Sequence, residues 1–121
     1  MQLRTWLYLK DIVKFGTIAI ELRGDMSREE VIADDRTYFA VERLLFIVGE
    51  AVNTAVLRES EVADLLTDTN LIRRFRNLLA HGYFKVNREQ VVGILFDNLE
   101  LLISEAAGVP QPIDDSDEPA S

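Results

Sequence analysis

The chain has 121 residues, which is enough for one compact domain. Its composition, with 48% apolar and 28% charged residues, is that of an ordinary globular protein, and the absence of cysteine excludes disulfides and thiolate metal sites. Arg4, Lys10, Asp11 and Lys14 interrupt the first twenty residues, and no apolar run reaches the roughly 18 residues of a membrane-spanning helix. We therefore expect a soluble, cytoplasmic protein.

The formal net charge is −8, of which a short acidic stretch near the C-terminus supplies half: Asp114, Asp115, Asp117 and Glu118. The remainder of the chain carries about −4 on the same basis. Affinity for nucleic acid comes largely from lysine and arginine, so an acidic domain is a poor general binder of phosphate backbones. Any contact with RNA would have to be local, or would use a groove built from more than one chain.

Residues 3–22 are predicted to form a first helix that is largely buried. Its polar positions fall on one stripe (Lys10, Lys14, Thr17 and Glu21), and apolar residues occupy most of the remaining circumference. Gly24 suits a helix C-cap in the left-handed region. Ser27 with Glu30 three residues later is a capping-box pattern, which predicts a short helix over residues 28–33.

The next helix is expected from Asp34-Asp35, two carboxylates suited to a helix N-terminus, to about Val56. Its centre, residues 44–49, has no polar side chain, which is typical of a central helix.

A repeat of polar residues runs along this central helix. Arg36, Arg43 and Glu50 recur every seven residues, and Asn53 lies close to the same line. The pattern indicates either a solvent-facing side or a polar seam turned toward a site or a partner. Solvent exposure is the favoured interpretation for Arg36 and Arg43, and the roles of Glu50 and Asn53 stay open.

In the second half, residues 59–66 are expected to form a short helix or connector, and residues 71–80 a helix that ends at His81-Gly82. Asn87 with Gln90 opens one closing helix, from Arg88 to about Ala106. Strand-type alternation is absent. The prediction is an all-α, four-helix-type bundle with additional short helices over residues 1–107, followed by an acidic, disordered tail over residues 108–121.

The stretch around His81, the only histidine of the chain, concentrates chemically capable side chains. Arg76 and Asn77 precede it, and Tyr83 follows after Gly82. Positions five residues apart differ by about 140° on a regular helix, so convergence of Arg76 and His81 requires His81 to lie at the helix end. Without further information, a lone histidine at a helix C-terminus is commonly structural, since imidazolium is favoured there by the helix dipole.

These residues resemble a known signature. Arg76, Asn77 and His81 look like the motif of the HEPN superfamily, and Tyr83 completes the Arg-x4-His-x-Tyr form of the HepT-like toxins. The flanking sequence is similar to that family as well, at Leu78-Leu79-Ala80, Phe84, residues 48–51 and residues 34–37. The similarity covers about residues 4 to 106, and the motif is specific mainly because it occurs within the expected order of helices.

The resemblance implies a HEPN-like helical bundle that forms a homodimer, with the motifs of two copies facing a shared cleft. It implies a metal-independent ribonuclease, the toxin of a toxin–antitoxin pair, with Arg76 and His81 as catalytic residues and Asn77 supporting them. The partner would be an MntA-like nucleotidyltransferase antitoxin, which transfers AMP to Tyr83. No metal and no cofactor are implied.

The chemistry of the side chains is compatible with this activity. Metal-free RNA cleavage needs a base for the 2′-hydroxyl and an acid for the 5′-oxygen, and histidine suits both roles near neutral pH. Arg76 would stabilise charge on the phosphorane. Because each chain has one histidine, two imidazoles at one phosphate require two chains. Nucleotide phosphate added to Tyr83 would bring negative charge to the place where RNA binds.

Two other interpretations remain. In the first, the bundle is a non-catalytic binding partner of a nucleotidyltransferase, an interpretation that the acidic charge favours. Alternatively, Arg76 and His81 only cap a helix, in which case alanine substitutions would lower stability by about 1 kcal/mol or less and change no activity.

Overall fold

The structure, a computed structural model, describes residues 1–68, 71–81 and 87–113, apart from the side chains of Ile72 and residues 78–81. Within these ranges every regular element is a helix, which confirms the all-α prediction. In chain order the elements are α1 (Leu3–Arg23), α2 (Arg28–Ala33), α3 (Asp35–Arg58), the 3-10 helix η1 (Ser60–Leu65), α4 (Leu71–His81), α5 (Arg88–Asp97) and α6 (Leu99–Ala107). None of the helices in the described ranges is both long and apolar enough to cross a membrane.

The helix starts and stops follow local chemistry. Gly24 ends α1 with a positive φ of 51°, and Ser27 and Glu30 form the predicted capping box of α2. Asn87 caps α5, as predicted. Its side chain accepts a hydrogen bond from the backbone N–H of Glu89, and no capping box with Gln90 is formed among the described contacts. The predicted boundary between a domain and a tail remains a prediction, since residues 114–121 lie outside the described part.

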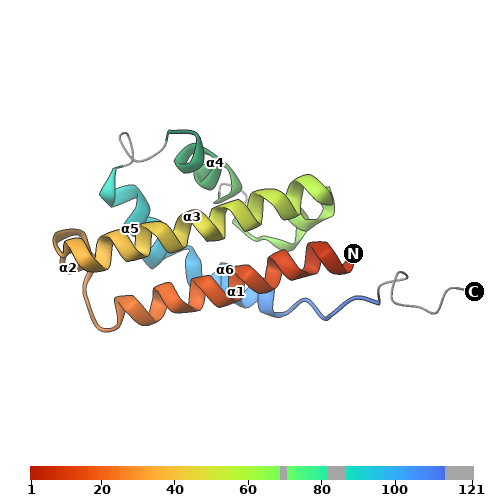
Figure 1. Cartoon of the computed structure of the whole chain (residues 1–121), viewed down its shortest axis with the longest axis horizontal. Coiled ribbons are helices and arrows are strands. Elements are labelled where there is room, and N and C mark those ends of the chain that lie inside the picture. The colour runs from red at the N-terminus through yellow and green to blue at the C-terminus, as the bar shows by residue number, and fades with distance from the viewer. Residues whose placement is uncertain (69–70, 82–86, 114–121) are drawn as a thin grey trace, which may run out of the picture.

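The central position of α3 is confirmed. α1 packs along one side of it, and α4 and α5 pack on the other (Figure 1). α6 lies against α1, and α2 joins α3 to α5. Trp6 of α1 donates its indole N–H to the backbone carbonyl of Val109 at 3.0 Å, which ties the chain after α6 to the start of α1.

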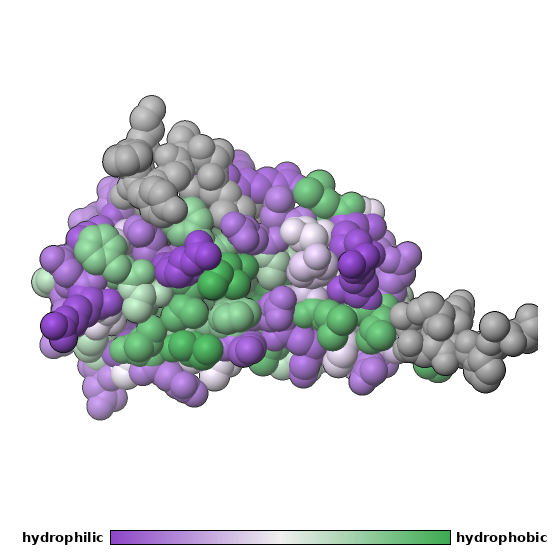
Figure 2. Space-filling view, in the orientation of Figure 1, coloured by the Kyte–Doolittle hydropathy of each residue, from purple (hydrophilic) through white to green (hydrophobic). Residues whose placement is uncertain are grey.

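The expectation that α1 is largely buried was wrong. Only one stripe of the helix is buried, made up of Thr5, Leu9, Ile12, Gly16 and Ala19. Leu7 is 50% exposed, and Ile18 and Leu22 are exposed as well. The reason is that α1 lies at the edge of the bundle and packs mainly against α3 and α6. Figure 2 shows hydrophobic residues gathered on the surface over α1 and α3.

The prediction of one closing helix was also wrong, because the helix is interrupted at Asn98, between α5 and α6. Asn98 has φ −126°, outside the helical range, and its side chain is almost fully buried. Its amide oxygen accepts from Arg74 at 2.9 Å, and its amide nitrogen donates to Asp68. These two bonds to distant parts of the chain compensate for the local break in the helix.

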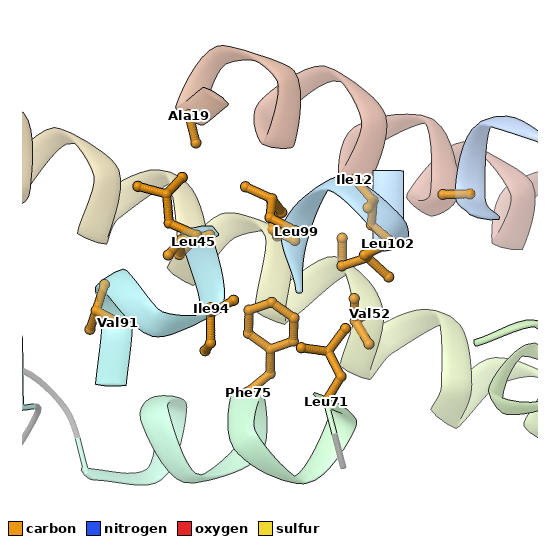
Figure 3. Packing of buried hydrophobic residues seen from close by; sticks show 14 of the residues in the cluster. Ile12, Ala19, Leu45, Val52, Leu71, Phe75, Val91, Ile94, Leu99 and Leu102 are labelled. Carbon is orange, nitrogen blue, oxygen red and sulfur yellow. The ribbon is translucent and has the colours of Figure 1, made fainter. Parts of the chain in front are cut away.

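α4 approaches α3 closely at Gly49, and this approach bears on the functional site. A Cβ atom on Gly49 would lie 2.8 Å from Cδ1 of Phe75, which is shorter than any ordinary contact. Phe75 is itself fully buried and points from α4 toward Ile94 and Val52 in the core (Figure 3). The missing side chain at residue 49 is therefore what allows α4 to lie against α3.

We predict that Gly49→Ala destabilises the fold. Alanine has a higher intrinsic helix propensity than glycine, which by itself would stabilise the helix by up to about 1 kcal/mol. Overlap with a buried aromatic ring costs about 1–3 kcal/mol, and the Phe75 ring that the new methyl group would meet is fully buried. Chemical denaturation should therefore give a lower free energy of unfolding.

Gly93→Ala is the matched control for this change. Gly93 is also helical, but its Cβ would meet nothing closer than 3.7 Å. This variant should be as stable as the wild type or more stable. Equal effects of the two substitutions would contradict the role assigned to Gly49.

Candidate functional site

Arg76 lies on the exposed side of α4, one residue after the buried Phe75. Its Nε donates to Oδ1 of Asn53 on α3 at 3.1 Å. Asn53 is one helical turn from Gly49, so the contact that seats Phe75 also sets the distance between Arg76 and Asn53. A guanidinium bonded through Nε keeps both terminal amino groups as donors, which is the edge that binds phosphate in bidentate fashion.

The structure describes only some of the other predicted site residues. Asn77 is exposed and next to Arg76 on α4, and His81 is the last residue of that helix, at the helix end as expected. The side chain of His81 lies outside the described part of the structure, as does all of Tyr83. Of the four predicted residues, Arg76 and Asn77 are thus described with their side chains.

The start of α5 is held in place by the contacts of Arg88, which we call the Arg88 anchor. The guanidinium of Arg88 donates to the carbonyl of Ile32 at 2.9 Å and pairs with Asp35 at 3.0 Å. It also lies 4.2 Å above the ring of Tyr38 and 5.0 Å from that of Phe39. Cation–π contacts and a charged hydrogen bond thereby fix the start of α5 to the start of α3.

Tyr38 belongs to this anchor. Its hydroxyl donates to Glu42 at 2.7 Å. Burial of the ring, and next the hydrogen bond to Glu42, raise the pKa of Tyr38 above its ordinary range. The hydroxyl therefore stays protonated at any physiological pH.

The three arginines of α4 prove to have different environments. Arg74 is bound to Asn98, which connects α4 to the α5–α6 junction, whereas Arg76 faces Asn53 and the solvent. Arg73 is exposed on the surface. Arg74 thus contributes to the packing of the bundle, whereas Arg76 lies at its surface beside α3.

Asn53 is the residue that the sequence analysis left out of the site. The signal was present in the spacing of polar residues along α3. That spacing cannot show that Asn53 meets Arg76, because the contact joins residues 23 positions apart. Glu50, one turn earlier, is exposed.

A metal centre was not expected, and none is assigned. Across residues 1–68, 71–81 and 87–113, no three His, Cys, Asp or Glu side chains are grouped so that they could hold a metal ion.

Comparisons with known proteins agree with the motif. The family described as "Ribonuclease HepT-like" matches residues 8–108, which is most of the chain and includes all four predicted site residues. A protein of Methanocaldococcus jannaschii named "Putative RNase MJ0127" is 30% identical over 112 residues, covering 92% of this chain and 91% of that protein. No solved structure matches the chain significantly. The order of helices, the motif on α4 and the match over residues 8–108 together show that the chain belongs to the HepT-like ribonuclease family.

Proposed function

We propose that the protein is a metal-independent endoribonuclease that acts in the cytoplasm as the toxin of a toxin–antitoxin pair. The observation that carries the proposal is the guanidinium of Arg76, held by Asn53 at the surface of α4 within the family motif. It presents fixed donors at the point where a phosphate would bind. Arg73 is a second exposed arginine, three residues earlier on the same helix of this acidic chain.

The proposed reaction is an internal transfer at one RNA phosphate. The 2′-oxygen attacks the adjacent phosphorus as a base removes its proton, and the bond to the 5′-oxygen breaks as an acid protonates the leaving group. The products are a 2′,3′-cyclic phosphate and a free 5′-hydroxyl. His81 takes the base and acid roles, Arg76 stabilises the charge on the phosphorane, and Asn77 helps to orient the phosphate.

The active unit in this proposal is a homodimer. Each chain supplies a single histidine, so a base and an acid of this type at the same phosphate come from two chains. A groove between two copies would also bring together the arginines of both α4 helices. The local positive charge would then be higher than a single acidic chain can provide.

We predict that Arg76→Ala and His81→Ala each lower RNA cleavage by about 100-fold or more, because each removes a group that acts in the transition state. The measurement is cleavage of a labelled RNA by the purified full chain in EDTA, with identification of the cyclic phosphate end. Arg4→Ala, which removes an exposed arginine of α1, should cleave as the wild type does. Undiminished cleavage by both motif variants would refute the assigned site.

Asn53→Leu is predicted to lower kcat/KM by about tenfold, since the Arg76 side chain loses the acceptor that orients it. Asn53→Asp keeps an acceptor and should retain most of the activity. In an Arg76→Ala background, Asn53→Leu should cost nothing more. The melting temperature should change little, because the contact is exposed. A loss of equal size with or without Arg76 would show that Asn53 does not act through Arg76.

Regulation by an MntA-like nucleotidyltransferase antitoxin is part of the proposal. The hydroxyl oxygen of Tyr83 attacks the α-phosphorus of ATP, pyrophosphate leaves, and the phenolic proton is lost to solvent. The chain then carries AMP next to the motif, where bulk and negative charge oppose RNA binding.

Incubation with such a nucleotidyltransferase and ATP should add AMP to the chain and abolish its RNA cleavage. Mass spectrometry of the intact protein measures the addition, and Tyr83→Phe should neither gain mass nor lose activity. Modification of the Tyr83→Phe variant would move the acceptor to another residue.

The second candidate function is a non-catalytic binding partner of the nucleotidyltransferase, which the net charge of −8 favours. Stable co-purification with that enzyme, combined with no cleavage of any RNA by the isolated wild-type chain, would support this alternative over the nuclease.

A further inference from the structure

Asn98 is a polar residue that the fold buries at the junction of α5 and α6. In the part of the chain that the structure describes, Asn98 and Thr5 are the two buried polar residues. The backbone of Asn98 also leaves the helical range, so one continuous helix is not formed here. Burying an amide is unfavourable unless its donor and acceptor are both satisfied. The presence of an amide at this place is therefore explained by the groups that it binds.

Both partners of the Asn98 side chain belong to α4 or to the chain just before it. The amide oxygen accepts from Nη1 of Arg74 at 2.9 Å, and the amide nitrogen donates to the carboxylate of Asp68. The backbone carbonyl of Asp68 in turn accepts from the N–H of Leu71, the first residue of α4, at 3.2 Å. An amide has a donor end and an acceptor end, so it can bind a carboxylate and a guanidinium at the same time.

α6 holds the entrance to α4 at a second point. Oε2 of Glu105 accepts from the backbone N–H of Thr67 at 2.8 Å and from its hydroxyl at 2.7 Å. Glu105 is seven residues after Asn98, which places both residues on the same side of α6. Two consecutive residues before α4, Thr67 and Asp68, are thus fastened to α6 and its N-terminal junction.

Two amides hold α4 from different sides. Arg74 and Arg76 are two residues apart, so they point in directions about 200° apart on a regular helix. Asn98 binds the first of them, and Asn53 on α3 binds the second. The ring of Phe75, between them in the sequence, is buried in the core (Figure 3). Rotation of α4 about its own axis is therefore resisted on both sides of the helix.

We propose that Asn98 is a positioning residue, which fixes the start and the rotation of α4 and thereby the place of Arg76. The proposal rests on the nuclease activity proposed above and adds a residue outside the motif to it. A side chain on a helix reaches about 5 Å from the axis, so rotation of α4 by about 10° moves it by about 1 Å. Such a displacement of a catalytic group can lower a rate by about 100-fold.

A reciprocal exchange of two side chains tests the proposal on the full chain. Asn98→Asp removes the donor and sets two carboxylates in contact, so it should lower kcat for RNA cleavage by about tenfold or more. KM should change less, because Arg76 is assigned to the charge of the transition state. Adding Asp68→Asn restores one donor opposite one carboxylate, and this double variant should regain most of the wild-type kcat. Asp68→Asn alone keeps an acceptor for Asn98 and should stay active.

Trp6→Phe is the control for a general loss of stability. It removes the hydrogen bond from the indole to the carbonyl of Val109, a contact that does not involve α4, and it keeps an aromatic ring. Its melting temperature should fall while its kcat, measured well below that temperature, stays at the wild-type value. A loss of kcat in Trp6→Phe equal to that in Asn98→Asp would overturn the proposal. So would a double variant that does not recover.

Hydrogen exchange separates this proposal from the proposed activity, because it needs no substrate. In Asn98→Asp the backbone amides of α4 should exchange at least about tenfold faster, while those of α1 change little, and the double variant should reverse the effect. Equal acceleration in both helices would indicate a general loss of stability and overturn the positioning role. A chain that shows the expected exchange pattern but cleaves no RNA would refute the nuclease and confirm that Asn98 holds α4. A wild type that cleaves RNA, with kcat and α4 exchange unchanged in Asn98→Asp, would refute the role of Asn98 alone.

Discussion

The contact between Gly49 and Phe75 is the one on which the arrangement of this protein depends. It lets α4 approach α3 closely, and it fixes the rotation of α4 because a buried aromatic ring accepts few orientations. A helix fixed in this way has a defined outward side. Arg76 follows Phe75 directly, so the packing of the core determines where the guanidinium emerges.

Polar contacts then hold α4 and its surroundings from several directions. Asn53 binds Arg76 from α3, while Asn98 binds Arg74 and Asp68 from the junction of α5 and α6. Arg88 secures the start of α5 to the start of α3. A protein with a net charge of −8 thus uses arginines both to build its scaffold and to present charge at its surface. The two uses differ in their partners, as Arg74 and Arg76 illustrate.

Much of the fold could be predicted from the sequence because it depends on neighbouring residues. Ser27 with Glu30 marks a helix start through contacts three residues apart, and the apolar centre of α3 reveals its central position. The break at Asn98 and the bond between Asn53 and Arg76 escaped prediction for the opposite reason. Each depends on side chains more than twenty positions away, and periodicity carries no information about such meetings. For the site, the motif indicated Arg76 and Asn77 but not the residue that orients the guanidinium.

The hydrogen bond from Trp6 to Val109 has a consequence for the topology of the chain. It brings the beginning and the end of the bundle together, so the path of the backbone is nearly a closed ring. A short linker between these ends would complete the ring with little change in the packing of α1 and α6. The sequence order of the helices is then separable from their arrangement in space, and a circularly permuted chain that opens at the exposed residues Gly24 and Asp25, between α1 and α2, is expected to fold into the same bundle.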